Sequence, residues 1–94
     1  MEQEARQALI ILGSDNRLRI LEVLSEKPLM HRELLQRIGN LSDSWYHLNE
    51  LRKTGLVTLD DTNRLQSTWS TSPKGLRAAA GYLQELADRA SEHA

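Results

Sequence analysis

The feature that most constrains the fold is a pair of short amphipathic segments followed by two strand-like segments, all within residues 31–70. Residues 31–38 read as a helix with one apolar face. Gly39 and Asn40 tolerate a left-handed backbone, so they predict a tight turn. A second helix is expected over residues 42–54. The pattern therefore predicts two helices packed across a short turn.

The second helix of this pair carries clear end signals. Ser42 is a good N-cap, and the charge of Asp43 in the first turn suits the helix dipole. Gly55 fits the position just past the last helical residue. Leu48 and Leu51 share one face and are expected to point inward. The opposite face is then left on the surface.

A β-hairpin is predicted directly after this helix. Residues 56–59 read as a strand, residues 60–63 as polar turn material, and residues 64–70 as the return strand, with Leu65, Ser67 and Trp69 alternating. Leu29 and Met30 form a further short extended stretch. The expected fold is mainly α with a small β-hairpin wing. It is a winged helix-turn-helix of about five helices and two to three short strands.

Helices are also expected at both ends of the chain. Residues 2–12 and 16–25 have broad apolar faces, which suggests that the first helix is buried on most sides. Ser72 and Pro73 fit the N-cap and N1 positions of a last helix over residues 73–91. That helix carries an apolar seam at three- and four-residue spacing, made of Leu76, Ala79, Ala80, Leu83, Leu86, Ala87 and Ala90.

Length and composition fit one globular domain over residues 1–94. The chain has 39% hydrophobic and 27% charged residues, a net charge of −1 and a pI of about 6.3. This balance argues against a nonspecific nucleic-acid coating protein, which should be strongly basic. The charges are uneven, however. The stretch from Asn16 to Thr54 holds 7 positive and 5 negative side chains, a net +2, so a local basic face is compatible with the sequence.

Several classes of function have little support in the sequence. The absence of cysteine excludes disulfides, cysteine zinc sites and thiol catalysis. No apolar run approaches the roughly 20 residues that span a membrane, and the N-terminal flank is wrong for a signal peptide, so a cytoplasmic location is expected. The last helix offers only a small set of residue types that bind metals, namely Glu85, Asp88, Glu92 and His93. No metal, cofactor or catalytic activity is expected.

Several segments of the chain, in order, resemble the ArsR-like winged-helix regulators. SDNRLRILEVL at residues 14–24 resembles their second helix, and residues 29–38 resemble the next one. WYHLNELRKTGLV at residues 45–57 resembles their recognition helix running into the wing. SPKG at residues 72–75 resembles the start of the last helix in these and in the related MarR-like and PadR-like regulators. The resemblance covers nearly the whole chain and implies DNA binding.

Two departures from the family pattern concern the recognition helix. The turn before it is a residue or two shorter than usual. Position 44 is Ser, where the family usually has a small aliphatic residue that faces the core. Leu41 or Trp45 is available to fill that gap. These departures bear directly on the register of the helix.

The expected interface places the helix over residues 42–54 in the major groove, which admits an α-helix. Asn49 is expected to contact adenine, and Arg52 and Lys53 to meet phosphates. Trp45 is either a core or interface residue or a base reader, and His47 is either a surface polar residue or a phosphate contact. The full set is Ser42, Ser44, Trp45, Tyr46, His47, Asn49, Arg52, Lys53 and Arg64.

The wing is poorly equipped for DNA. Asp60 and Asp61 would repel phosphates, which leaves Arg64 as its one useful cation. The wing is therefore expected to contribute little to DNA binding or to contact something other than DNA.

The terminal helices are expected to form a two-fold homodimer. The resemblance also implies such a dimer, and it would present two recognition helices about 34 Å apart to a near-palindromic DNA site. The expected interface residues are Ala5, Leu9, Leu12, Leu76, Ala80, Leu83 and Ala87.

The leading hypothesis is thus a sequence-specific transcription regulator, expected to be a repressor. The main alternative is a winged helix that docks other proteins in a transcription or DNA-partition complex. This alternative is favoured by the acidic pI, the acidic wing tip and an exposed Trp45. A third reading, an architectural DNA protein with little sequence preference, is disfavoured by the low net charge.

Overall fold

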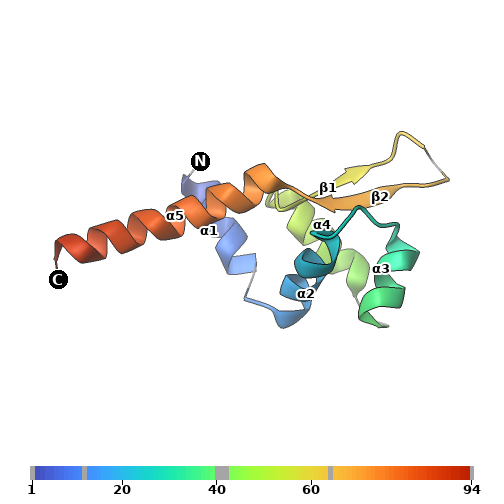
Figure 1. The fold of residues 1–94 in the computed structure, drawn as a ribbon, viewed down its shortest axis with the longest axis horizontal. Coiled ribbons are helices and arrows are strands. Elements are labelled where there is room, and N and C mark those ends of the chain that lie inside the picture. The colour runs from blue at the N-terminus through green and yellow to red at the C-terminus, as the bar shows by residue number, and fades with distance from the viewer. Residues whose placement is uncertain (1, 12, 40–42, 64, 94) are drawn as a thin grey trace.

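The computed structural model describes residues 2–11, 13–39, 43–63 and 65–93. Within them, five helices and one hairpin follow each other in the predicted order, which confirms the winged helix-turn-helix (Figure 1). The elements are α1 (Glu2–Ile11), α2 (Asp15–Leu24), α3 (His31–Ile38), α4 (Ser44–Lys53), β1 (Val57–Asp60), β2 (Thr68–Thr71) and α5 (Pro73–Glu92).

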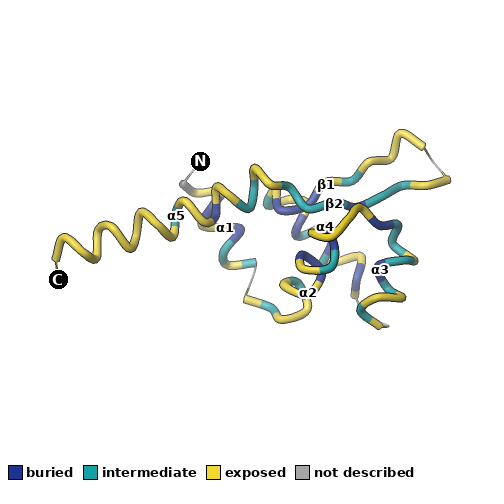
Figure 2. Tube along the Cα trace, in the orientation of Figure 1, coloured by how far each residue is buried: buried dark blue, intermediate teal, exposed yellow. Residues whose placement is uncertain are grey.

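The main core lies where α2, α3 and α4 meet the hairpin. Ile20 of α2, Leu34 of α3 and Leu48 of α4 are all completely buried. Trp69 of β2 is buried in the same cluster. Figure 2 shows that the buried residues concentrate in this region, while most of α5 is exposed. α2, α3 and the hairpin thus form the platform that carries α4.

The hairpin is antiparallel, with Leu59 opposite Trp69. Leu29 adds a third, one-residue piece. Its backbone N–H donates to the Trp69 carbonyl at 3.0 Å, and the Trp69 N–H donates back at 2.7 Å. The predicted extended stretch at Leu29 is therefore confirmed as a single bridge.

The return strand begins later than predicted. The expected strand over residues 64–70 is wrong at its start, because β2 begins at Thr68. The Asn63 side chain accepts the Leu65 N–H at 3.1 Å, and the Asn63 carbonyl accepts the Gln66 N–H at 3.0 Å. Such local bonds compete with strand pairing. Leu65 is consequently 91% exposed and does not alternate into the sheet.

The end signals of the helices are confirmed at two sites and corrected at a third. Gly55 adopts φ 80° just after α4. At the start of α5, Ser72 is the N-cap before Pro73, and its hydroxyl accepts the Gly75 N–H at 3.1 Å. Asp43, by contrast, is the N-cap of α4 and adopts φ 63° instead of lying in the first turn. Asp tolerates this left-handed conformation. The predicted cap Ser42 lies outside the described residues.

The terminal helices pack against each other within one chain, since α1 contacts α5. Ala5 and Ala8 of α1 are buried, but Ile10 is 62% exposed, so the prediction of a helix buried on most faces is wrong. The C-terminal part of α5 extends past α1 without a neighbouring element in view (Figure 1). This extension contributes to the longest dimension of the molecule, 53 Å.

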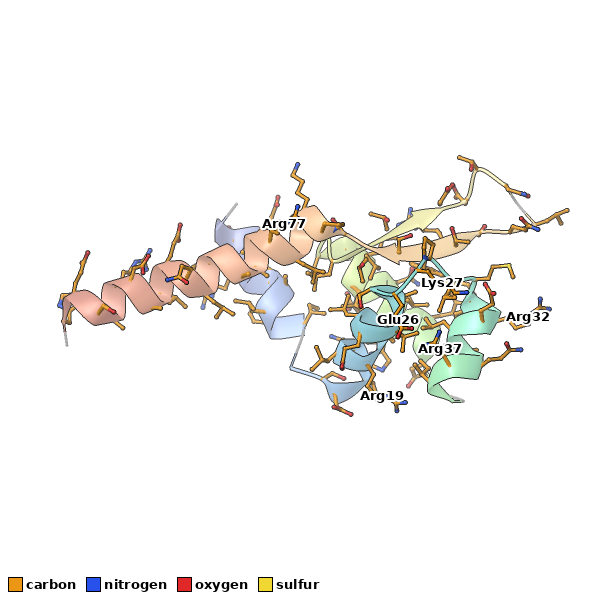
Figure 3. The ribbon with its side chains drawn as sticks, in the orientation of Figure 1. Arg19, Glu26, Lys27, Arg32, Arg37 and Arg77 are labelled. Atoms are coloured by element: carbon orange, nitrogen blue, oxygen red, sulfur yellow. The ribbon has the colours of Figure 1, made fainter. Side chains whose placement is uncertain are left out.

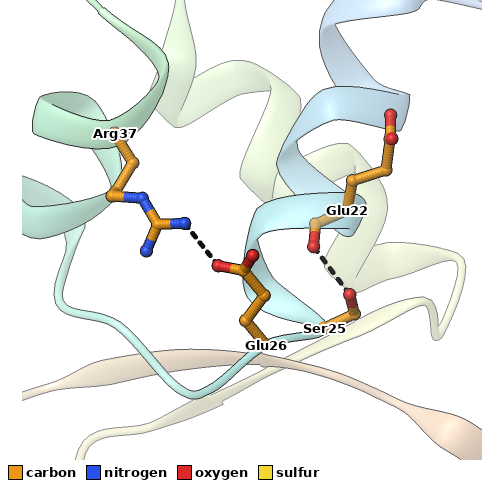
Figure 4. Close-up of polar contacts among 4 residues, drawn as sticks. All are labelled: Glu22, Ser25, Glu26 and Arg37. Atoms are coloured by element: carbon orange, nitrogen blue, oxygen red, sulfur yellow. Dashed lines mark hydrogen bonds and ion pairs between the residues drawn. The ribbon is translucent and has the colours of Figure 1, made fainter.

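Polar contacts at the C-terminal end of α2 join it to α3 and close its own last turn. Arg37 of α3 forms an ion pair with Glu26, which follows α2, and the Ser25 hydroxyl donates to the Glu22 carbonyl at 2.6 Å (Figure 4). Exposed ion pairs of this kind contribute little stability. The orientation of α3 beside α2 therefore rests mainly on the buried apolar side chains.

Candidate nucleic-acid interface

The 10-residue helix α4 has one buried face and one exposed face. Leu48 and Leu51 are completely buried, as predicted, and hold the helix on the core. The opposite face mixes aromatic, amide and basic groups that can donate hydrogen bonds or stack. Its exposed residues are Trp45, Tyr46, Asn49, Arg52 and Lys53.

Ser44 does not belong to this exposed face. It is only 6% exposed, and its hydroxyl oxygen lies 2.9 Å from Nε2 of His31 at the start of α3. The prediction that Ser44 contacts DNA is therefore wrong, because its side chain is buried against His31. A polar residue occupies this inward position because His31 gives it a hydrogen-bond partner, which a buried hydroxyl requires.

Trp45 lies on the surface and not in the core, with 56% of its area exposed. Its ring stacks on His31 at a centroid distance of 4.0 Å and meets Trp69 edge-on at 6.2 Å. Burial lowers the pKa of His31 below its ordinary value, which favours the neutral imidazole. One side of the indole is therefore fixed by the protein, while a large part remains open to a ligand.

His47 is half-buried, and it accepts a hydrogen bond from a side chain outside the helix-turn-helix. The Arg17 Nε–H of α2 donates to His47 Nδ1 at 2.9 Å. The same guanidinium lies 5.7 Å from the centre of the Tyr46 ring, within the range of a cation–π contact. Two consecutive residues of α4 thus contact a single arginine.

Arg52 and Lys53 end α4 and place two positive charges at the surface. The Lys53 ammonium lies 3.9 Å from the Glu50 carboxylate, but its side chain is 76% exposed. An exposed pair of this kind is worth little. Both basic residues also line a groove between α4 and α1 that includes Glu4. They remain available to an anionic partner.

The wing keeps its negative charge. The Asp60 carboxylate accepts the Thr62 hydroxyl at 2.8 Å and the Thr62 N–H at 3.1 Å. These hydrogen bonds lower the pKa of Asp60. Asp61 is exposed beside it, and Arg64 lies outside the described residues. The described part of the wing therefore offers no favourable surface to phosphates.

The basic residues of the middle stretch are spread over α2, α3, α4 and the segment between α2 and α3. Arg19, Lys27, Arg32 and Arg37 lie on α2, on α3 and on the segment between them, and Arg37 is near Glu26 (Figure 3). The net +2 that the sequence gives to residues 16–54 is thus not concentrated on α4. Any anion bound at α4 would meet only part of this charge.

The predicted dimer residues fall into two groups. Ala5 is buried, and Leu9 and Leu76 pack partly against the chain's own core. Further along α5 the seam is uncovered, with Leu83 52% and Leu86 39% exposed. Ala80 and Ala87 are exposed as well, and Leu12 lies outside the described residues.

Residues 2–11, 13–39, 43–63 and 65–93 bear on two other kinds of site, a metal centre and a membrane span. This part of the chain contains no group of three or more His, Cys, Asp or Glu side chains arranged to hold a metal ion. None of its helices combines the length and apolar character needed to cross a membrane.

No protein-family model matches the sequence, and no curated protein sequence matches it either. Solved structures do match. An ArsR-like transcriptional regulator from Rhodococcus sp. RHA1 is 21% identical with a TM-score of 0.84, over 97% of this chain and 86% of that one. A protein from Mycobacterium tuberculosis is 29% identical with a TM-score of 0.64, over 97% of this chain and 94% of that one. An ArsR family transcriptional regulator is 18% identical with a TM-score of 0.78 and the same coverage.

The chain has the fold of the ArsR-like regulators.

In this fold, α4 is the second helix of the helix-turn-helix, and its sequence is the segment that resembles the recognition helix of these regulators. Two residues beside α4 were not singled out from the sequence as part of the site. Arg17 lies in the segment that resembles the family's second helix, and His31 begins the next helix. Neither has a sequence pattern that marks it, because their partners lie 30 and 13 residues away.

Proposed function

We propose that this ArsR-like chain is a sequence-specific DNA-binding regulator of transcription that inserts α4 into the major groove. The observation that carries the proposal is the exposed face of α4. It presents aromatic, amide and basic groups on a helix anchored by Leu48 and Leu51. The major groove offers each base pair as a distinct pattern of donors and acceptors, which such a face is able to read.

The residues of α4 divide into two roles in this proposal. Asn49 makes a bidentate contact to adenine, and Tyr46 bonds a base edge or a phosphate. Arg52 and Lys53, at the helix end, meet phosphates and set the position of the helix. Ser42 and Arg64 remain expected contacts, but they lie outside the described residues. The proposal includes no catalytic step, metal or cofactor.

The proposed regulator is a homodimer joined through its terminal helices. Leu83 and Leu86 expose apolar surface on a part of α5 that no element of the described residues covers. The small residues Ala80 and Ala87 on the same seam would allow a second helix to approach closely. A two-fold dimer would hold two copies of α4 about one DNA turn apart, roughly 34 Å, and would favour a near-palindromic site.

Repression is the proposed outcome, because a dimer bound at a promoter would occlude the polymerase. The cytoplasmic location expected from the sequence is kept in the proposal.

A protein-docking role is the alternative, and two observations favour it. The aromatic side chains of Trp45 and Tyr46 are 56% and 57% exposed on adjacent positions. The described part of the wing carries Asp60 and Asp61 where a DNA-binding wing would carry cations. Exposed aromatic residues are enriched at protein–protein contacts.

Selection from a pool of randomised duplexes separates the two roles. The full chain is mixed with the pool at low salt, and the bound duplexes are sequenced over successive rounds. The DNA-binding proposal predicts enrichment of a short motif with two-fold symmetry. Failure to retain any duplex at low salt would refute it and favour the protein-docking role.

A further inference from the structure

One side chain outside the helix-turn-helix connects three parts of the fold. Arg17 of α2 donates from Nε to His47 Nδ1 at 2.9 Å and from Nη1 to the Ile11 carbonyl, at the end of α1, at 3.2 Å. Its guanidinium also lies 5.7 Å from the ring centre of Tyr46. Arg17 is half-buried, so these contacts hold it in a defined place beside α4.

The contact with Arg17 determines which nitrogen of His47 carries the proton. An arginine Nε always bears hydrogen and can only donate, so Nδ1 of His47 must accept. A neutral imidazole has one N–H group. The proton of His47 therefore lies on Nε2, because the hydrogen bond made by one ring nitrogen sets the state of the other.

Nε2 of His47 takes part in no hydrogen bond among the described residues. Nδ1 is occupied by Arg17, so Nε2 is the ring nitrogen that is left for a partner. His47 is half-buried, so part of the residue is open to solvent, and it follows the exposed Tyr46 on α4.

The geometry points to Arg17 as a positioning residue that makes His47 a fixed hydrogen-bond donor within the DNA-reading face of α4. This inference rests on the proposed function. The partner of His47 is then an acceptor atom of the DNA. It is either a base edge such as guanine, which offers N7 and O6 in the major groove, or a phosphate oxygen. A group that only donates would be rejected at this position.

The tautomer of His47 is tested in the free full-length chain, without DNA. Long-range proton–nitrogen NMR correlations show which ring nitrogen is protonated. We expect the Nε2–H form in the native protein and loss of that preference in Arg17→Met. Arg19→Met is the matched control, because Arg19 lies on the same helix and its hydrogen bond, at 3.5 Å, goes to Ile38 and not to α4. A native Nδ1–H form, or an unchanged tautomer in Arg17→Met, would overturn the inference.

Two substitutions of His47 test the outward donor itself. The amide nitrogen of Gln reaches about the place of Nε2, whereas the amide of Asn reaches only about the place of Nδ1. His47→Gln should therefore keep most of the affinity for the selected duplex. His47→Asn and Arg17→Met should each weaken binding about 2- to 12-fold, the net value of one hydrogen bond. Equal binding by the native chain, His47→Asn and Arg17→Met would overturn the inference.

Repeating the duplex selection with His47→Asn identifies the acceptor. A change at one base position of the motif assigns the contact to a base edge. Uniformly weaker binding with an unchanged motif assigns it to a phosphate. If the native chain binds no duplex at all, the proposed function and the DNA acceptor both fail. The NMR result still decides whether Arg17 orients His47.

Discussion

Gly75, in the first turn of α5, is predicted to be intolerant of any side chain. A Cβ at this position would lie 2.0 Å from the Gly55 carbonyl oxygen and 2.9 Å from its carbonyl carbon. Both are backbone atoms, and Gly55 is itself held at φ 80° after α4. The start of α5 would have to move away from the end of α4 in Gly75→Ala.

The expected change in the free energy of unfolding of Gly75→Ala is the difference between two opposing contributions. Overpacking costs up to about 3 kcal/mol, and a clash with backbone falls at the upper end of that range. Replacing a helical glycine by alanine returns up to about 1 kcal/mol. The free energy of unfolding of Gly75→Ala should therefore fall by about 2 kcal/mol. For a domain of this size, that corresponds to a melting temperature roughly 8–16 °C lower.

Gly81, six residues further along α5, is the matched control. A Cβ there meets no atom within 4 Å, so Gly81→Ala should gain the helix term alone, about 0.5–1 kcal/mol. Thermal unfolding followed by circular dichroism measures both variants. The protein concentration must be equal, because the melting temperature of a dimer depends on it. A Gly75→Ala variant as stable as the native chain, or shifts of equal sign in both variants, would refute the reasoning.

Three further predictions concern the dimer, the α3–α4 contact and base reading. Leu83→Glu, which places charge on the exposed seam of α5, should convert a dimer into a monomer at micromolar concentration by light scattering, and a native chain that is already monomeric would contradict the dimer. Because burial lowers the pKa of His31 below its ordinary value of 6.5, the folded state binds fewer protons than the unfolded chain. Its contribution to stability should be complete above about pH 6.5 and lost as the pH falls through the lower folded-state pKa. Urea unfolding should show this loss in the native chain but not in His31→Gln, and a native chain that gains stability on acidification would contradict it. Asn49→Ala should relax the selected motif at one base position, at a cost on the order of 1–3 kcal/mol, and an unchanged motif would mean that Asn49 reads no base.

Features fixed by local chemistry were predictable from the sequence. The helix over residues 31–38 was placed correctly, because its ends depend on the neighbouring turn residues. The positive φ of Gly55 and the cap formed by Ser72 were also anticipated, since each follows from the properties of one residue and its neighbours. The inward leucines of α4 follow from helical periodicity alone.

Features that depend on distant side chains were not predictable in the same way. Ser44 faces inward because His31 provides a hydrogen-bond partner 13 residues earlier, and Arg17 reaches His47 across 30 residues. Periodicity identifies the face on which a residue lies but not its partner on another element. The late start of β2 has a different, local origin, because hydrogen bonds to the side chain and the carbonyl of Asn63 take the place of strand pairing there.

Binding of DNA by α4 is tested most directly by the salt dependence of duplex affinity. Affinity for the selected duplex is measured by fluorescence anisotropy over a range of salt, for the native chain and for the double variant Arg52→Ala/Lys53→Ala. A plot of log affinity against log salt should have a slope of about −0.9 for each phosphate contacted. The double variant should make that slope shallower by about 1 for each residue removed. A native chain that binds no duplex at low salt, or binds with a flat salt dependence, would contradict the claim.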